Sequence, residues 1–307
     1  MHRTHADKAV SKRRRAMVLA VLSSCALTVG ITGTASATTT SATAGKQHGT
    51  PRTNYVALGD SYTSGPLIPL QVDANCARSD HNYPSLTARE REVTSFTDVS
   101  CGGATTAEMW QAQGTNGPQL DAVKRDTDLV TVQIGGNDVG FGSIISTCAG
   151  LSSQDPSGNP CQQHYGSAGY DQLTLEILRT APKVARVLKA VHTKAPHARV
   201  VVVGYPDLLP DDGTGCYPSV PFAAKDFPYL RNTEKRLNVM LRAVALLNRA
   251  DYVDTYGPTV GHDMCKAPAD RWIEPLRPTS PAAPAHPNAK GQEAMAQALA
   301  KTLGRRR

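Results

Sequence analysis

The chain is poor in aromatic residues, and patterns that would define several other protein classes are missing from it. Phe, Trp and Tyr together make up 5% of its 307 residues, which does not favour the exposed aromatic platforms on which sugars stack. No G-x-x-x-x-G-K-S/T phosphate loop and no zinc-type C-x-x-C pair occurs. These absences argue against nucleotide-driven chemistry and zinc-dependent folding, and we expect neither a metal nor another cofactor.

A hydrophobic run long enough to cross a bilayer is also lacking. The run at residues 16–31 falls short of the ~20 apolar residues that a membrane helix needs. Four basic residues, 12–15, precede it, and the small-residue cleavage pattern Ala35-Ser36-Ala37 follows. We therefore expect residues 1–37 to be a signal peptide and the mature protein to be secreted to the extracellular side.

Two alternatives concern this leader. Residues 11–15 weakly resemble a twin-arginine signal, and the sequence ending at Cys25 could be a lipoprotein acylation box. Apolar sequence continues past Cys25, where a lipoprotein would turn polar, so a lipid anchor is the less favoured interpretation. Residues 38–51, rich in Thr, Ala, Gly and Ser, predict a flexible leader without a core.

Net charge gives no support for nucleic-acid binding. Cleavage after Ala37 removes six of the 33 Lys and Arg and one of the 26 Asp and Glu, so the formal charge falls from +7 to about +2. The basic residues 305–307 predict a solvated tail. Asp80-His81 and His262-Asp263 could be proposed as metal ligands, but isolated His residues in polar loops are expected to be ordinary surface residues.

Cysteine, although scarce, is informative. Six residues remain after the leader: Cys76, Cys101, Cys148, Cys161, Cys216 and Cys265. An even number of cysteines in an exported protein predicts three disulfides. Their spacing alone allows fifteen pairings.

Alternating strand and helix patterns indicate an α/β domain over residues 52–304. Strands are expected at 55–58, 96–99, 129–134, 199–204 and 251–256, and helices at 170–194, 229–249 and 289–303. This alternation predicts a parallel sheet with helices on both faces, and no repeat or second domain is evident. The long loops 205–226 and 257–285 are expected to line the substrate cleft.

Four short segments contain the residues that could carry chemistry: Gly59-Asp60-Ser61-Tyr62, Cys101-Gly102-Gly103-Ala104-Thr105, Gly135-Gly136-Asn137-Asp138 and His286-Pro287-Asn288. Each one alone could be an ordinary turn. Three of them follow predicted strands, however, and the fourth opens a predicted helix. Because ligands bind at the carboxyl ends of strands in such sheets, we expect the four segments to converge.

These residue types fit acyl transfer. A Ser hydroxyl becomes a nucleophile when a His takes its proton, and the tetrahedral intermediate needs donors aimed at its oxyanion. Ser61 is the candidate nucleophile and His286 the candidate base. The backbone N–H groups of Ser61 and Gly103 and the side-chain amide of Asn137 are the candidate oxyanion hole.

On these four motifs the chain resembles the SGNH, or GDSL-type, hydrolases. Residues 79–84 and 137–141 resemble more narrowly the secreted actinomycete lipases and esterases. The resemblance implies a three-layer α/β/α sandwich around a mostly parallel, five-stranded, flavodoxin-like sheet. It also implies the sequential disulfides Cys76–Cys101, Cys148–Cys161 and Cys216–Cys265.

One position departs from the family pattern. The family's last block usually has Asp three residues before the His, but here Ala283 stands there. Some members of the secreted subgroup use a backbone carbonyl instead, and prolines 281, 284 and 287 would restrict this loop. We expect the Ala283 carbonyl to orient His286, with a carboxylate from Asp263, Asp270 or Glu274 as the alternative.

The expected function is that of a cofactor-free, secreted serine ester hydrolase, a lipase or carboxylesterase, and a monomer. Its substrate is a small-molecule or lipid acyl ester, with transient contact with a lipid interface. The apolar segment Gly65-Pro66-Leu67-Ile68-Pro69-Leu70 could be a core plug or the wall of an acyl pocket. Alternatives are a phospholipase A-type enzyme, a carbohydrate O-acetyl esterase and, from another class, a non-catalytic binding protein on the same scaffold.

Overall fold

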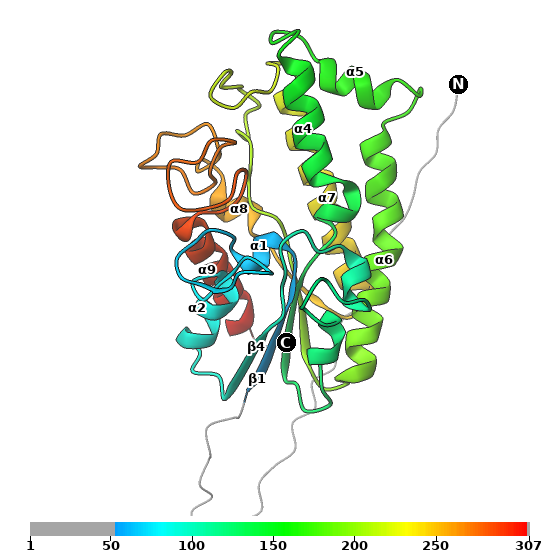
Figure 1. The fold of residues 1–307 in the computed structure, drawn as a ribbon. Helices are drawn as coiled ribbons and strands as arrows, with labels where there is room; N and C mark the ends of the chain where they lie inside the picture. The colour runs from blue at the N-terminus through cyan, green and yellow to red at the C-terminus, as the bar shows by residue number, and fades with distance from the viewer. Residues whose placement is uncertain (1–52, 306–307) are drawn as a thin grey trace, which may run out of the picture. The chain divides into compact units, whose positions relative to one another are not determined.

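Five parallel strands form the central sheet of the protein (Figure 1). They are β1 (Asn54–Gly59), β4 (Ser95–Asp98), β5 (Leu129–Gln133), β6 (Arg199–Val203) and β7 (Asp251–Val253). Their order across the sheet is β4-β1-β5-β6-β7, a doubly wound arrangement whose strand order reverses between β1 and β5. The computed structural model describes residues 53–305. The expected signal peptide and leader, and residues 306–307 of the tail, lie outside the described residues.

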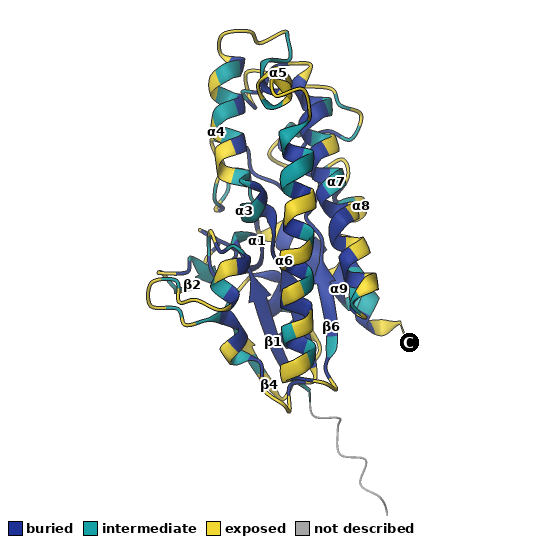
Figure 2. Ribbon diagram, turned by 90° about the vertical axis from the view of Figure 1, so that its right-hand side faces the viewer, coloured by how far each residue is buried: buried dark blue, intermediate teal, exposed yellow. Residues whose placement is uncertain are grey.

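Alternate side chains of each strand face different helical layers. Val56 and Leu58 of β1 belong to the core cluster beneath α6 (Gln172–Lys194) and α7 (Asp226–Leu247). Tyr55 and Ala57 belong to the cluster beneath α2 (Tyr83–Glu90) and α9 (Ala289–Gly304). Figure 2 shows the buried sheet between helices whose outer faces are exposed. The expected three-layer α/β/α architecture with a five-stranded parallel sheet is therefore confirmed.

The three long helices begin within three residues of their expected starts. The side chain of Asp171 caps α6 by accepting the backbone N–H of Leu173. Asn288 caps α9 in the same way through the N–H of Gly291. Such caps satisfy N–H groups that have no partner within the helix, so both helix starts are encoded locally.

Sequence reasoning missed several shorter elements. These are the hairpin of β2 (Gln71–Asp73) and β3 (Arg78–Ser79), the helices α1 (Ser61–Ser64), α2, α3 (Gly136–Val139), α4 (Phe141–Ser152), α5 (Pro160–Gly166) and α8 (Tyr256–Thr259), and the 3-10 turns η1 (Thr106–Met109) and η2 (Gln119–Ala122). In α4, Gly, Ser and Thr have low helix propensity, so tertiary packing of its buried Ile144 and Cys148 outweighs the local preference. For α2 the Asn82 cap followed by Pro84 was an available signal.

The structure contains the disulfides Cys76–Cys101, Cys148–Cys161 and Cys216–Cys265. The pairing implied by the family resemblance is thus confirmed. The second bridge joins α4 to α5, and the third joins the two long loops 205–226 and 257–285. Within residues 53–305, none of the helices is both long enough and apolar enough to cross a membrane.

Candidate active site

The turn after β1 places Ser61 at the carboxyl end of the sheet. Gly59 ends the strand, and a Cβ there would collide with the Thr63 side chain and lie 2.8 Å from the Gln133 carbonyl oxygen. Asp60 then caps the short helix α1 by accepting the Tyr62 N–H at 2.9 Å. A residue with a side chain could not replace Gly59 without moving the turn, so the position of the Ser61 hydroxyl depends on this glycine.

Ser61 and His286, 225 residues apart in the chain, are in hydrogen-bond contact. The Ser61 Oγ lies 2.7 Å from His286 Nε2. The other ring nitrogen, Nδ1, lies 2.8 Å from the Pro284 carbonyl oxygen. Because a carbonyl can only accept, Nδ1 must carry the proton, and the neutral ring then presents a bare Nε2 to the Ser61 hydroxyl. This is the tautomer that a general base for Ser61 needs.

The carbonyl that contacts His286 belongs to Pro284, so the expectation of Ala283 is wrong. The Ala283 carbonyl instead accepts the His286 backbone N–H at 3.2 Å, which closes a tight turn over residues 283–286. Pro284 occupies the second position of this turn, and Ala285, at the third, has a φ of 59°. These are the features of a type II turn. The Ala283 carbonyl oxygen accepts the hydrogen bond that closes the turn. The next carbonyl along the chain, that of Pro284, is therefore the one that faces the imidazole.

The candidate carboxylates do not contact the imidazole, whose two nitrogens are occupied by Ser61 and Pro284. Asp263 accepts the Cys265 N–H at 2.8 Å. Asp270 offers its backbone carbonyl to His262 Nδ1 at 2.6 Å. Glu274 accepts the side-chain amide of Asn288 at 2.9 Å. In this geometry a backbone dipole orients the base.

Glu274 nevertheless supports the loop that carries His286. Its backbone N–H donates to the His286 carbonyl at 2.9 Å, and its own carbonyl accepts the Ala285 N–H at 3.0 Å. The fully buried carboxylate pairs with Arg271 at 3.3 Å. Burial alone would raise the pKa of Glu274, but hydrogen bonds from Asn288 and neighbouring backbone, with the Arg271 charge, lower it. The carboxylate therefore stays ionised and braces the loop.

Aromatic rings surround the imidazole. The Tyr62 ring stacks on His286 with centroids 4.7 Å apart, and Phe141 meets it edge-on at 6.0 Å. The Tyr62 hydroxyl donates to the Ala285 carbonyl at 2.7 Å. Burial lowers the pKa of His286 to about 4, although the hydrogen bond to Pro284 acts in the opposite direction. The ring is therefore neutral and able to accept a proton over most of the pH range.

Asn137 and Gly103 share a pocket with the nucleophile. Together with Ser61 and His286 they line one shallow pocket. One hydrogen of the Asn137 amide is donated to the Ala104 carbonyl at 2.9 Å. A primary amide has two hydrogens, so the second is left for a substrate oxygen. The structure thus brings together the four residues singled out from the sequence.

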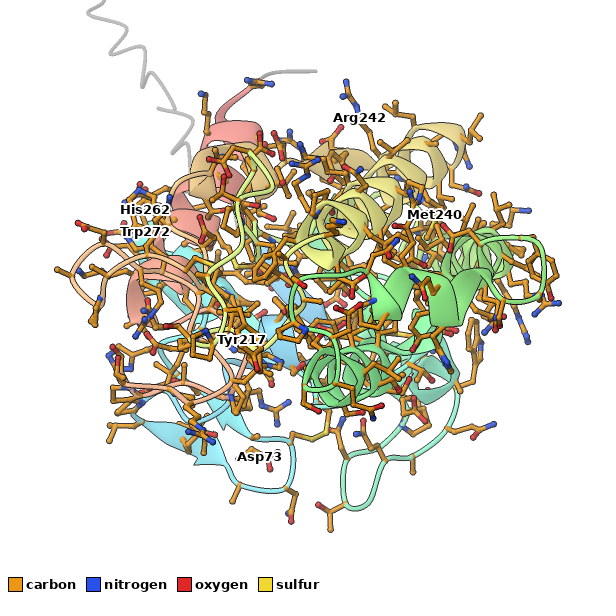
Figure 3. All side chains as sticks on the ribbon, turned by 90° about the horizontal axis from the view of Figure 1, so that it is seen from above. Asp73, Tyr217, Met240, Arg242, His262 and Trp272 are labelled. Atoms are coloured by element: carbon orange, nitrogen blue, oxygen red, sulfur yellow. A yellow bond between two sulfur atoms is a disulfide. The ribbon has the colours of Figure 1, made fainter. Side chains whose placement is uncertain are left out.

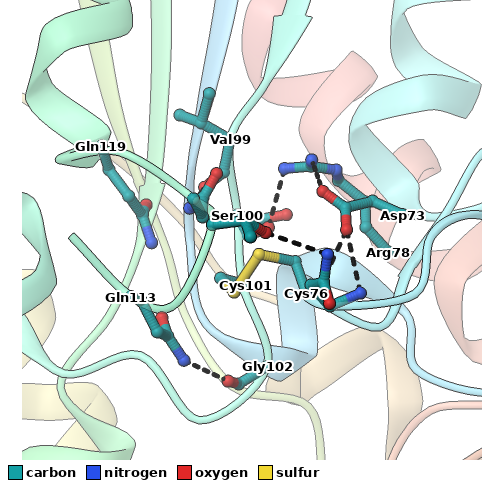
Figure 4. Close-up of a disulfide and its surroundings, with 12 residues drawn as sticks. Asp73, Cys76, Arg78, Val99, Ser100, Cys101, Gly102, Gln113 and Gln119 are labelled. Carbon is teal, nitrogen blue, oxygen red and sulfur yellow. Dashed lines mark hydrogen bonds and ion pairs between the residues drawn. A yellow bond between two sulfur atoms is a disulfide. The ribbon is translucent and has the colours of Figure 1, made fainter.

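The disulfide Cys76–Cys101 anchors the loop that carries Gly103 (Figure 4). The Gly102 N–H donates to the Cys76 carbonyl at 2.8 Å, and Gln113 donates to the Gly102 carbonyl at 2.7 Å. Gly103 itself has a φ of 77°, which glycine adopts without strain. These contacts leave the loop little freedom to move away from Ser61.

Tyr205, which sequence reasoning missed, joins two of the motifs. Its hydroxyl donates to the Asp60 carboxylate at 2.6 Å and accepts the Gly136 N–H at 2.9 Å. Burial raises the pKa of Asp60 to about 7, against the hydrogen bonds from Tyr205 and Tyr62. The one sequence signal that could have identified Tyr205 was its place just after β6, at the carboxyl edge of the sheet. The contact fixes the Ser61 turn relative to the Asn137 turn.

An apolar cavity of about 80 Å³ extends inward from Ser61. Its wall combines α4, α6, α7 and both long loops, through residues that include Ile144, Ile177, Leu208, Phe222, Leu237 and Met264. Both long loops therefore line this cavity, and its use as the substrate cleft stays a prediction. The segment 65–70 contributes differently: Ile68 is buried in the core, Pro66 lines the shallow pocket, and neither lines the deep cavity.

The residue pairs considered as metal ligands make ordinary side-chain contacts. His262 stacks on Trp272 with ring centroids 3.4 Å apart. Both residues are labelled in Figure 3. His81 contacts Asp80 at 2.5 Å on the surface. Over residues 53–305, no three His, Cys, Asp or Glu side chains are grouped so that they could hold a metal ion.

Comparison with known proteins agrees with this geometry. The profile of the GDSL-like Lipase/Acylhydrolase family matches residues 57–294. The chain is 42% identical over 299 residues to Lipase 2 of Streptomyces coelicolor, covering 95% of this chain and 97% of that protein. Among solved structures, phospholipase A1 from Streptomyces albidoflavus is 27% identical, with a TM-score of 0.69 over 82% of this chain and 99% of that one. The extracellular lipase of Streptomyces rimosus is also 27% identical, with a TM-score of 0.68 over 81% and 99%.

Proposed function

Since the chain belongs to the GDSL-like lipase/acylhydrolase family and is a carboxylic-ester hydrolase, we propose that Ser61 and His286 act as its catalytic dyad. The observation that carries this proposal is the 2.7 Å contact between Ser61 Oγ and His286 Nε2, with Nδ1 held by the Pro284 carbonyl. The retained site residues disfavour a purely non-catalytic binding role. Sequence and structure together support a secreted lipase or carboxylesterase.

The reaction proceeds through an acyl-enzyme. Ser61 Oγ attacks the ester carbonyl carbon while its proton passes to His286 Nε2. The Ser61 and Gly103 N–H groups and the second hydrogen of the Asn137 amide receive the oxyanion. The intermediate expels the alcohol, which takes the proton from His286. A water molecule then attacks the acyl-enzyme, again giving its proton to His286. The second intermediate expels Ser61 Oγ, which takes this proton back from His286, and the acid is released.

The deep cavity supports an acyl chain longer than acetyl. It measures about 80 Å³ and is lined mostly by apolar side chains next to Ser61, as a site for an alkyl chain would be. An acetyl group would leave most of it unfilled, which disfavours a carbohydrate O-acetyl esterase. Likeness to a phospholipase A1 makes phospholipids the second substrate class to examine.

Exposed apolar side chains near the mouth support contact with a lipid surface. Leu67, Leu70 and Val72 are each more than half exposed. They follow Pro66, which lines the shallow pocket and whose carbonyl accepts the Ala283 N–H at 3.1 Å. A transient lipid interface at this rim would bring an acyl chain to the cavity.

Secretion is supported by three lines of argument. The leader has the pattern of a signal peptide. Three disulfides are typical of proteins in oxidising compartments. A structural relative is named as an extracellular lipase. Detection of the mature chain in the culture medium, with its new N-terminus determined, tests this part of the proposal.

Serine-directed phosphonate labelling tests the nucleophile. We expect the wild-type enzyme to lose hydrolysis of p-nitrophenyl octanoate on labelling, with the label on Ser61. Ser61→Ala should be inactive and unlabelled, whereas Ser146→Ala, at an exposed serine of α4, should behave as wild type. Labelling elsewhere, or substantial turnover by Ser61→Ala, would refute the assignment. A series of p-nitrophenyl esters, phospholipids and acetylated sugars ranks the substrates.

A further inference from the structure

An open, positively charged pocket adjoins the shallow pocket that contains Ser61. The two pockets share Asn137, the side-chain donor of the candidate oxyanion hole. The open pocket measures about 540 Å³, and its wall combines residues of η1 and α6. Trp110, Lys183 and Arg186 are among its lining residues. A group bound there is therefore next to the site at which the ester reacts.

Arg186 offers this pocket a set of free hydrogen-bond donors. The residue is exposed, and its guanidinium carbon lies over the Trp110 ring, 4.4 Å from the ring centroid. Within residues 53–305, the Arg186 N–H groups have no hydrogen-bond or ion-pair partner. Attraction to the face of a ring holds a cation without using its N–H donors. These donors remain available to an anion, whose oxygens a guanidinium can bind in pairs.

The other charges of the pocket are balanced. Of the described residues, Asp138 contributes the one carboxylate of the lining, and its side chain is 3% exposed. It accepts the Thr106 N–H at 2.8 Å and the Thr106 hydroxyl at 2.6 Å, and Lys183 Nζ lies 3.3 Å from it. Once Lys183 is paired with Asp138, the charge of Arg186 remains. The half-exposed Lys183 ammonium keeps further donors for an anion.

We propose that this pocket is a subsite for an anionic phosphodiester in the alcohol part of the ester, as in a glycerophospholipid, with Arg186 as its main contact. The inference rests on the proposed function, because it assumes that the ester carbonyl is bound between Ser61 and Asn137. With the acyl chain in the deep apolar cavity, the alcohol part is left to the open side of the site. In a glycerophospholipid a short glycerol backbone joins the ester to the phosphate, so both groups can be bound at once.

Two substrates that differ in one charge test this proposal. Dihexanoylglycerophosphomethanol carries an anionic phosphodiester, and its methyl phosphotriester is neutral. Both are assayed as dissolved monomers, so that no lipid interface contributes. We expect the wild-type enzyme to prefer the anionic ester by about fivefold or more in kcat/KM at low ionic strength, because a paired contact to Arg186 is stronger than an ordinary exposed ion pair. Added salt should reduce this preference.

A variant and a matched control assign the preference to Arg186. Arg186→Gln should reduce the ratio of the two kcat/KM values to about twofold or less, because only the screened charge of Lys183 remains. Arg242→Gln removes an exposed arginine of α7 that does not line the pocket, and it should keep the wild-type ratio. Since each ratio compares two substrates with the same variant, a general loss of activity cancels.

The outcomes separate the subsite from the proposed function. A wild-type enzyme without a preference overturns the subsite, even if Arg186→Gln does not fold, and so does a preference that survives in a folded Arg186→Gln. Inhibition by inorganic phosphate that depends on Arg186, without a substrate preference, would show a site for free anions and overturn the assignment to a lipid head group. In each case hydrolysis of p-nitrophenyl octanoate leaves the proposed function intact. If the wild-type enzyme hydrolyses none of these esters, the proposed function itself fails.

Discussion

The depressed pKa of His286 predicts activity in unusually acidic solution. With a pKa of about 4, the imidazole is about 90% neutral at about pH 5, whereas an ordinary pKa of 6.5 would leave about 3% neutral. The ratio of kcat/KM at about pH 5 to its plateau should therefore be about 30-fold higher than an unperturbed histidine permits. The assay measures the release of p-nitrophenol from p-nitrophenyl octanoate at the wavelength where p-nitrophenol and p-nitrophenolate absorb equally.

A variant tests the cause of the shift. Phe141→Ala removes one of the two rings that cover the imidazole and should move the acidic limb upward by about one pH unit. Ser146→Ala, on the exposed side of the same helix, should not move it. The folded protein binds the His286 proton more weakly than the unfolded chain does. This contribution to stability is therefore full above about pH 6.5 and is lost as pH falls toward about 4.

Titration of Asp60 is an alternative origin for an acidic limb in the pH profile. Its pKa is raised to about 7, so an acidic limb near that pH could arise from Asp60 instead. We expect its titration to have little effect on rate, because a protonated Asp60 can still accept the Tyr205 hydroxyl on its carbonyl oxygen. A limb near pH 7 that disappears in Asp60→Asn would assign the profile to Asp60 and contradict the prediction for His286.

Three further predictions concern the supporting structure. Asn137→Ala should lower kcat by about 10²–10³ with little change in KM, because its free amide hydrogen acts on the transition state; a change in melting temperature alone would make it a structural turn residue. Glu274→Gln should lower the free energy of unfolding by about 3–5 kcal/mol, because it breaks the buried pair with Arg271, while kcat falls less than about tenfold. A thousandfold loss of kcat in a folded Glu274→Gln would instead identify a carboxylate triad. Thiol titration of the denatured, unreduced protein should find no free thiol, and two or more per chain would contradict the three-disulfide structure.

Much of the fold follows from local patterns in the sequence. The apolar runs of β1, β5 and β6 and the capped helices α6 and α9 are visible without tertiary information, because strand burial and helix capping involve near neighbours. Elements such as α4 were not visible. Its helical state depends on packing and on the disulfide to α5, which unite residues that no local pattern relates.

For the candidate site, the sequence by itself determined the residue types: a Ser after β1, a Gly after β4, an Asn after β5 and a His before α9. Their convergence could be predicted because parallel strands share a carboxyl edge. Only the tertiary structure decided that Pro284, rather than Ala283, faces the imidazole, because a turn selects among adjacent carbonyls by backbone angles. Only the structure, likewise, placed Tyr205 against Asp60 and brought residues of α4, α6 and α7 around one cavity next to Ser61. Those contacts join segments far apart in the chain, and residue types alone do not encode which distant side chains meet.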